Sequence, residues 1–327
     1  MPRAPHDTRS NRALAHFHNV QICFQLVAYY YTKVQLLIEQ IKTIPRIIKT
    51  TQGFMLKKSY LYTMKHNSPL LTYPIDTSVM AFSTTRHGGH GSDAYGTFNC
   101  TPYSGDEPEV VRANQKLLCN WVGIPEEKLI IPYQTHSCNV LTIDHDFMQM
   151  TSEDRHAILQ EKDAVMTSLK GVCLCISTAD CIPILLYDPV HKAIAAIHAG
   201  WRGTVGRIVE QTLQAMHETY GTQYANLRAI IGPGISLKAF EVGFEVYKAF
   251  DEAGFDMERI AQWHEAKGKY HLDLPLANRL QLQAMGIPTE QIHDSHICTY
   301  ARHDDFFSAR RLGIKSGRIL NGIVIKE

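Results

Sequence analysis

Hydrophobic and polar residues alternate in short runs from about residue 70 to the C-terminus, a pattern typical of strands interleaved with helices. It predicts helices over 108–123, 205–219, 244–253 and 275–285. It predicts strands over 78–84, 130–134, 140–143, 163–167, 172–177, 182–187, 193–198, 227–231 and 319–325. Thr204 is the expected N-cap of the second helix, and Gly123 and Gly221 are expected to end the first two. The predicted fold is α/β (α+β), a single domain of mixed β-sheets flanked by helices.

Residues 1–63 differ from the rest of the chain. They carry nine Lys and Arg against two Asp and Glu, a net charge of +7, so the remainder carries −6. The apolar run 20–31 follows several arginines, but no A-x-A-like cleavage site follows it. We expect this extension to lie outside the fold, residues 64–327 to form the domain, and Met64 to be the true start.

Composition narrows the class of protein. The 327 residues are 45% hydrophobic and 20% charged with a net charge of +1, which excludes a disordered chain and a nucleic-acid binder that acts through bulk charge. No uncharged apolar run reaches the length of a membrane span, about 18 residues. The eight cysteines have no disulfide-framework spacing, which favours a reducing, cytoplasmic compartment. Cys173 and Cys175 alternate with apolar residues and are expected in the core.

A turn at Asp188–His191 between two apolar strands predicts a hairpin. If the turn is centred between Pro189 and Val190, Cys181 lies directly opposite His198, with Cβ atoms about 4.5–5.5 Å apart. That spacing suits two ligands of one zinc ion, and a register slip of one residue would separate them. The third candidate ligand is His136, in a polar break between two strands. The alternative is that each of the three is an ordinary structural residue.

Two glycine-rich loops also carry arginines. Gly200–Gly203 leads into the predicted helix at Thr204, whose N-terminus favours an anion, and it contains Arg202. The loop that begins Arg86-His-Gly-Gly adds a second guanidinium. Together the loops suggest a site for phosphate or a similar oxyanion, although glycine-rich turns after strands are common.

At these residues the chain resembles the YfiH/YlmD-type purine nucleoside phosphorylases, a family long described as multicopper polyphenol oxidases or laccase-like proteins. The resemblance runs from about Met80 to the C-terminus. It is carried by Ser83-Thr-Thr-Arg-His-Gly-Gly, Gln134-Thr-His, Asp163-Ala-Val-Met-Thr, Thr178-Ala-Asp-Cys-Ile-Pro, His198-Ala-Gly-Trp-Arg-Gly-Thr, Gly232-Pro-Gly-Ile, Phe240-Glu-Val-Gly, Cys298-Thr and Phe306-Phe-Ser-Ala-Arg-Arg. The loop after Gly89 departs from the family pattern.

The resemblance implies Zn²⁺ bound by His136, Cys181 and His198, with Cu²⁺ able to bind in vitro. It implies phosphorolysis of inosine, adenosine, guanosine and methylthioadenosine, and deamination of adenosine. The partners are therefore purine nucleosides and phosphate, without nucleic acid or membrane, in a monomer or homodimer. The expected catalytic residues are Arg86, Cys181 and His198, and the expected substrate and phosphate contacts are Arg86, Asn99, Arg202 and Gly203.

Three rival functions remain open. The first is a copper-dependent polyphenol oxidase. The second is a Cys–His hydrolase with Cys181 as nucleophile and His198 as base. The third is a binding role as a peptidoglycan quality-control factor.

Four further residues are candidates for the same cleft. Asp180 is expected either to support the metal ligands or to cap a turn. Cys298 is expected to line the cleft. Phe306 and Phe307 offer surfaces for stacking of a purine. The alternative is that they are ordinary core residues, and we expect this of one of the two.

Overall fold

The apolar runs of the sequence assemble into three sheets in the computed structural model, which describes residues 68–327. The five-stranded sheet has the order β1 (Leu70–Tyr73), β2 (Val79–Thr84), β14 (Ile319–Ile325), β6 (Cys173–Thr178) and β3 (Leu129–Ile130). The six-stranded sheet has the order β13 (Ile292–Asp294), β9 (Arg228–Ile231), β7 (Ile182–Asp188), β8 (Ala193–Ala199), β5 (Ala164–Thr167) and β4 (Val140–Thr142). The small third sheet has the order β10 (Glu241–Val242), β12 (Lys269–Leu272) and β11 (Ala261–His264).

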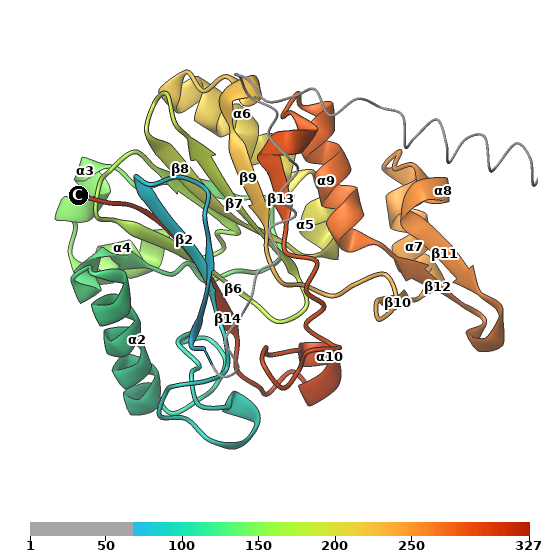
Figure 1. Cartoon of the computed structure of the whole chain (residues 1–327), viewed down its shortest axis with the longest axis horizontal. Coiled ribbons are helices and arrows are strands. Elements are labelled where there is room, and N and C mark those ends of the chain that lie inside the picture. The colour runs from blue at the N-terminus through green and yellow to red at the C-terminus, as the bar shows by residue number, and fades with distance from the viewer. Residues whose placement is uncertain (1–67) are drawn as a thin grey trace, which may run out of the picture. The chain divides into compact units, whose positions relative to one another are not determined.

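The helices fall between these strands along the chain (Figure 1). They are α2 (Pro108–Val122), α3 (His145–Gln149), α4 (Ser152–Ile158), α5 (Trp201–Val205), α6 (Ile208–Tyr220), α7 (Phe244–Glu252), α8 (Met257–Ile260), α9 (Leu274–Ala284) and α10 (Ala309–Leu312). Parallel pairs, such as β4 with β5, and antiparallel pairs, such as β7 with β8, occur in one sheet. The expected mixed α/β architecture is therefore confirmed.

The two large sheets pack face to face, and strand β6 shows how the alternation of side chains builds the layers. Leu174 and Ile176 point between the sheets, where they join a cluster with Leu185 and Ile194 of the six-stranded sheet. Cys173 and Cys175 point the other way, together with Leu118 of α2. Both cysteines are fully buried, so their predicted place in the core is confirmed.

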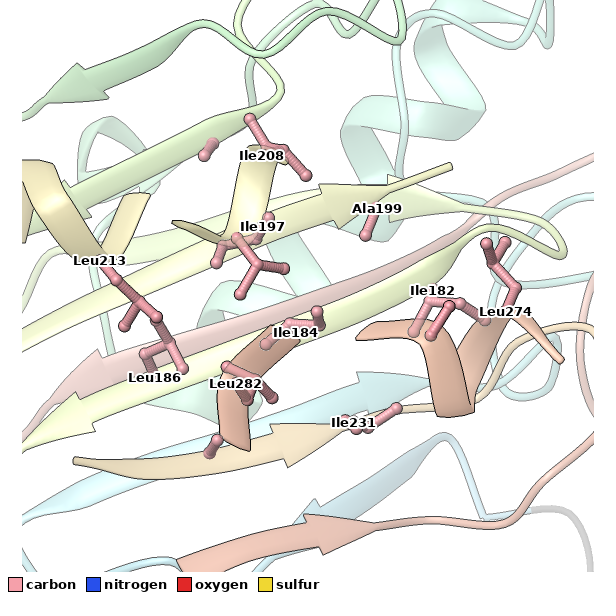
Figure 2. Close-up of a cluster of buried hydrophobic side chains, with 14 of the residues drawn as sticks. Ile182, Ile184, Leu186, Ile197, Ala199, Ile208, Leu213, Ile231, Leu274 and Leu282 are labelled. Atoms are coloured by element: carbon pink, nitrogen blue, oxygen red, sulfur yellow. The ribbon is translucent and has the colours of Figure 1, made fainter. Parts of the chain in front are cut away.

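The outer face of the six-stranded sheet is covered by α6 and α9. Figure 2 shows Ile184, Leu186 and Ile197 of β7 and β8 beneath Leu213 of α6 and Leu282 of α9. Burial of a large aliphatic side chain contributes about 1.5–3 kcal/mol, so this layer holds the β7–β8 hairpin in place.

Three predictions, for the hairpin and for the helical segment that follows it, are wrong in detail. Asp188 pairs with Ala193, so the loop spans four residues instead of two, and Lys192 adopts a left-handed conformation with φ 53°. The predicted helix over 205–219 is two helices, because α5 already begins at Trp201 and Arg207 (φ 63°) interrupts the chain before α6. Gly200, not Thr204, is the N-cap residue of α5.

The expectations for residues 1–63, including a start at Met64, fall outside the described residues. Within residues 68–327 there is no helix with the length and apolar character that a membrane crossing requires.

Candidate active site

Three side chains selected from the sequence come together at the open end of the β7–β8 hairpin. His136, Cys181 and His198 each offer one ligand atom, and these atoms lie within 4.8 Å of one another. Cys181 Sγ is 3.8 Å from His136 Nε2, and the rings of His136 and His198 have centroids 4.9 Å apart. His198 is buried, Cys181 is half-buried and His136 is exposed, so the group is accessible from the His136 side.

The hairpin register explains how two of the ligands share a face. His198 pairs with Pro183, so Cys181 is its diagonal neighbour and not, as predicted, its direct partner. The error is two residues, and residues two apart in a strand face the same side, so the ligands still converge. Gly200 leaves space for the side chains of His136 and Cys181, because a Cβ at this position would lie 2.8 Å from His136 Cδ2 and 3.0 Å from Cys181 Sγ.

A buried carboxylate, Asp163, organises the two histidines. Its Oδ1 lies 2.6 Å from Nδ1 of His198 and accepts the backbone N–H of His136 at 3.0 Å. Its Oδ2 accepts the N–H groups of Thr135 and Ser137 and the Ser137 hydroxyl. Burial raises the pKa of Asp163, but the hydrogen bonds from His198 and Ser137 outweigh it and leave the pKa below its usual value.

The bond to Asp163 determines which nitrogen of His198 can bind a ligand. Because Nδ1–H is donated to the carboxylate, the lone pair of Nε2 is free to face His136 and Cys181. No role was predicted for Asp163, although it opens one of the motifs quoted above. Nothing local marks it, because its partners lie 26–35 residues away in the chain.

Charge couples the thiol to the histidines. Burial raises the pKa of Cys181, but His198 and His136 outweigh it and lower the pKa to about 6. Burial lowers the pKa of His198, yet Cys181 and Asp163 raise it to about 9. Each group thus favours the charged form of the other, a thiolate beside an imidazolium.

The donor set fits a metal ion. Two imidazoles and one thiolate are common zinc ligands, and bonds of about 2.0–2.3 Å in a tetrahedron place ligand atoms about 3.5 Å apart. The separation of 3.8 Å between Cys181 Sγ and His136 Nε2 is close to that spacing. The orientation of His198 by a carboxylate is also typical of zinc sites.

Asp180, next to Cys181, ties the C-terminal part of the chain to the site. Its carboxylate accepts the hydroxyls of Thr299 and Ser308 at 2.6 and 2.7 Å and the backbone N–H of Arg310 at 2.7 Å. Asp180 has φ 88°, a conformation that costs a non-glycine residue about 1–3 kcal/mol. These bonds fix the backbone that presents Cys181.

Arg86 follows β2 and is held by backbone oxygen atoms. Its Nη1 donates to the carbonyl of His303 at 2.7 Å, and its guanidinium lies over the ring of Phe307, 5.3 Å from the centroid. The backbone N–H of Arg86 donates to the backbone carbonyl of Asp305. None of these contacts is an ion pair, although the charge of Asp304 acts on the guanidinium and raises its pKa against the effect of burial. The role of Arg86 toward a substrate stays a prediction.

Asn99 is fully buried, and its amide is occupied on both sides. Its Nδ2 donates to Ser104 and Asp106 at 2.9 Å each, and its Oδ1 accepts the backbone N–H of Arg318 at 3.0 Å. The structure thus gives Asn99 a positioning role for Arg318, while a direct substrate contact stays a prediction. Arg318 was not selected from the sequence, because a Gly-Arg pair before a strand has no signature.

The remaining candidates lie in different surroundings. Arg202 is exposed in α5 and stacks on Trp201, 4.3 Å from the ring centroid. Gly203 is buried inside α5 instead of preceding a helix. Their contact with phosphate stays a prediction.

The expected stacking surfaces are part of the core. Phe306 and Phe307 are both 0% exposed, so core is the correct interpretation for both rings and not for one. Cys298 lines a cavity of about 380 Å³ with Ser236 and Arg279, and none of the three metal-ligand candidates lines that cavity. Its expected place in the cleft of the triad stays a prediction.

Comparison with known proteins identifies the family of this chain. The family model described as multi-copper polyphenol oxidoreductase laccase matches residues 80–326. The chain belongs to this family. The resemblance to YfiH and YlmD proteins is confirmed.

Relatives within the family have enzyme names. A purine nucleoside phosphorylase of Bacteroides thetaiotaomicron is 54% identical over 251 residues, 77% of this chain and 93% of that protein. Adenosine deaminase RL5, from an unknown prokaryotic organism, is 42% identical over 248 residues, 76% of this chain and 94% of that protein. The crystal structure of YlmD from Geobacillus stearothermophilus matches with a TM-score of 0.74 at 29% identity, covering 81% of this chain and 98% of that one.

Proposed function

We propose that the chain is a zinc-dependent purine nucleoside phosphorylase that cleaves inosine, adenosine, guanosine and methylthioadenosine with phosphate and also deaminates adenosine. The observation that carries this proposal is the convergence of His136, Cys181 and His198 on one accessible point. The reaction class is supported by relatives named purine nucleoside phosphorylase and adenosine deaminase.

A three-ligand zinc supplies a Lewis acid and a bound water whose pKa is lowered to about 7. The chain's own residues prepare the reactants. Asp163 holds the Nδ1 proton of His198 and so keeps Nε2 directed at the group. Arg86 attracts phosphate and orients one of its oxygen atoms toward C1′ of the ribose, which contributes through proximity and charge.

The copper oxidase is a rival function that one specific observation supports, namely the description of the matching family model. Copper binds imidazole and thiolate more tightly than zinc does, so these ligands would accept it in vitro. In residues 68–327, however, His136, Cys181 and His198 are the one group of three or more such side chains close enough to share an ion. This supports a mononuclear site over the several metals that oxygen reduction requires.

The Cys–His hydrolase also has some support, because the low pKa of Cys181 suits a nucleophile as well as a metal ligand. Metal content separates the two functions, since a nucleophilic thiolate needs no zinc.

The test uses the full chain, purified without added copper and analysed for metal. It is incubated with inosine and adenosine, with and without phosphate, and the products are separated. We expect stoichiometric zinc, free base only with phosphate, inosine from adenosine, and loss of all turnover in Cys181→Ala. Cys298→Ala is the matched control, because it removes a thiol outside the triad.

The other outcomes reject the proposal in different ways. Zinc without turnover would favour a binding role such as peptidoglycan quality control. Turnover of other substrates without metal would favour the hydrolase. Copper together with oxidation of phenols would favour the oxidase.

A further inference from the structure

A second arginine lies beside the segment that carries Cys181. Strand β14 pairs with β6 so that Ile319 is opposite Thr178. Arg318 directly precedes Ile319, and the antiparallel register therefore places it next to residue 179, two residues before the ligand Cys181. The resemblance to the family assigned no role to this position.

The guanidinium of Arg318 is held only by neutral groups. Its Nη1 donates to the carbonyls of Ser316 and Gly317 at 2.6 and 3.0 Å, and its Nη2 donates to the carbonyl of Ile314 at 2.9 Å. A guanidinium has five N–H donors, so two remain for which no described residue supplies an acceptor. Half-buried cations without an anionic partner are costly, which indicates that the partner is a ligand.

The charges that act on Arg318 include two from the segment that carries Cys181. Burial lowers the pKa of Arg318, while charge on Cys181, Asp180 and Tyr95 raises it. Among the described residues, none of these three forms a hydrogen bond or an ion pair with the guanidinium. The pairing of β14 with β6 places Arg318 beside the segment that carries Cys181, and no carboxylate among residues 68–327 pairs with its guanidinium.

Arg86 and the backbone just before Arg318 pack on the same ring, that of Phe307. Arg86 lies over Phe307 at 5.3 Å, and Gly317 packs so closely on the same ring that a Cβ would lie 2.4 Å from it. Gly317 also donates its N–H to the carbonyl of Ala94 at 3.1 Å, which joins the loop after Arg86 to the segment before β14. Phe307 is fully buried, so this ring holds the Arg86 side chain and the backbone of Gly317 close to each other.

We propose that Arg318 is a second anion-binding arginine of this site and that it binds the phosphate substrate together with Arg86. The inference rests on the proposed function for the identity of the anion. Inorganic phosphate carries between one and two negative charges at neutral pH, and the planar fork of arginine matches its oxygen atoms in a bidentate manner. The role of Asn99 follows, because its amide fixes the backbone of Arg318.

The test measures binding of inorganic phosphate to the full chain by calorimetry, and the KM values for phosphate and for inosine. In Arg318→Gln we expect the Kd for phosphate to rise about 30-fold or more, and the KM for phosphate to rise in parallel. The KM for inosine should change less than about threefold. Arg112→Gln is the control, since Arg112 is an exposed arginine paired with Glu109.

A conservative variant keeps the test valid if Arg318→Gln folds poorly. Arg318→Lys retains the charge but not the fork, so phosphate should bind about tenfold more weakly with unchanged zinc content. Wild-type phosphate affinity in both variants, in a protein that cleaves inosine, would overturn the role of Arg318 and leave the proposed function standing. Weakened phosphate binding in a chain that cleaves no nucleoside would support the arginine site and reject the proposed function.

Discussion

Replacement of Asp163 by Asn tests whether one buried carboxylate controls both the ligand geometry and the stability of the site. The carboxylate accepts five hydrogen bonds, two on Oδ1 and three on Oδ2. An amide keeps one oxygen and replaces the other with an NH₂ group, so at least two donors lose their acceptor. Each buried donor without an acceptor costs about 1–3 kcal/mol, which predicts a loss of about 2–6 kcal/mol in the free energy of unfolding.

The metal affinity should fall as well, because the amide in Asp163→Asn cannot accept the Nδ1 proton of His198 through a charged oxygen. If the amide donates to Nδ1, the proton moves to Nε2 and the ligand lone pair is lost. Loss of such a supporting carboxylate typically weakens metal binding about 10–100-fold. The assays are urea unfolding of the full chain and competition for zinc with a chelator.

A partly exposed carboxylate provides the matched control. Asp76→Asn removes an ion pair with Arg228 that lies away from the triad, and it should cost no more than about 1 kcal/mol with unchanged zinc affinity. The reasoning is refuted if Asp163→Asn unfolds at the wild-type urea concentration and competes for zinc as the wild type does. Destabilisation with unchanged zinc affinity would assign Asp163 a purely structural role.

Three further changes have simple expected outcomes. Hydrogen bonds from Ser78 lower the pKa of Asp76 below its ordinary 3.8. The ionised carboxylate therefore stabilises the fold fully above about pH 4, and this stabilisation is lost as the pH falls through the lowered pKa. Asp76→Asn should accordingly flatten the acid side of a plot of unfolding midpoint against pH. Gly200→Ala places a methyl group 2.8 Å and 3.0 Å from atoms of two ligands, and zinc affinity should fall at least about tenfold in a chelator assay. Gly322→Ala brings a Cβ to 2.4 Å from the ring of Phe82 in the core, and thermal unfolding should show a loss of about 1–3 kcal/mol.

The fold was largely predictable because most of its strands and helices are long enough to show the period of their hydrophobic pattern. The helix over 108–123 is found at Pro108–Val122, and Gly123 ends it in a left-handed conformation, φ 80°. The final strand, 319–325, has its predicted bounds. The hairpin loop was misplaced because Lys192, unlike glycine or asparagine, gives no signal for a left-handed conformation.

The candidate metal ligands were predictable for a different reason from the residues that support them. Cys181 and His198 flank one hairpin, so a local pattern brings them together, and a register error of two residues leaves them on one face. Asp163 binds partners far away in the chain, and Arg318 lies beside residue 179 only because β14 pairs with β6. Their roles appear only when the strands are paired, which sequence periodicity alone does not determine.

Two buried aspartates explain how the site tolerates an unfavourable backbone. His136 has φ 62° and Asp180 has φ 88°, so a ligand and the neighbour of a ligand both adopt conformations that side chains disfavour. In the first case Asp163 accepts the N–H groups on both sides of the strained residue. In the second case the strained residue itself accepts bonds from Thr299, Ser308 and Arg310.

The bonds of Asp163 join segments next to β4 and β5 of the six-stranded sheet, and those of Asp180 join two segments that each connect the two large sheets. The geometry of the site therefore depends on the assembled sheets and not on either loop alone. A metal ion that binds only this geometry must then stabilise the native state against unfolding by its binding free energy. Removal of the metal with a chelator should accordingly lower the unfolding temperature of the wild type more than that of Asp163→Asn, whose ligands are already released from the carboxylate. Equal shifts in the two proteins would show that the carboxylate and the metal act independently.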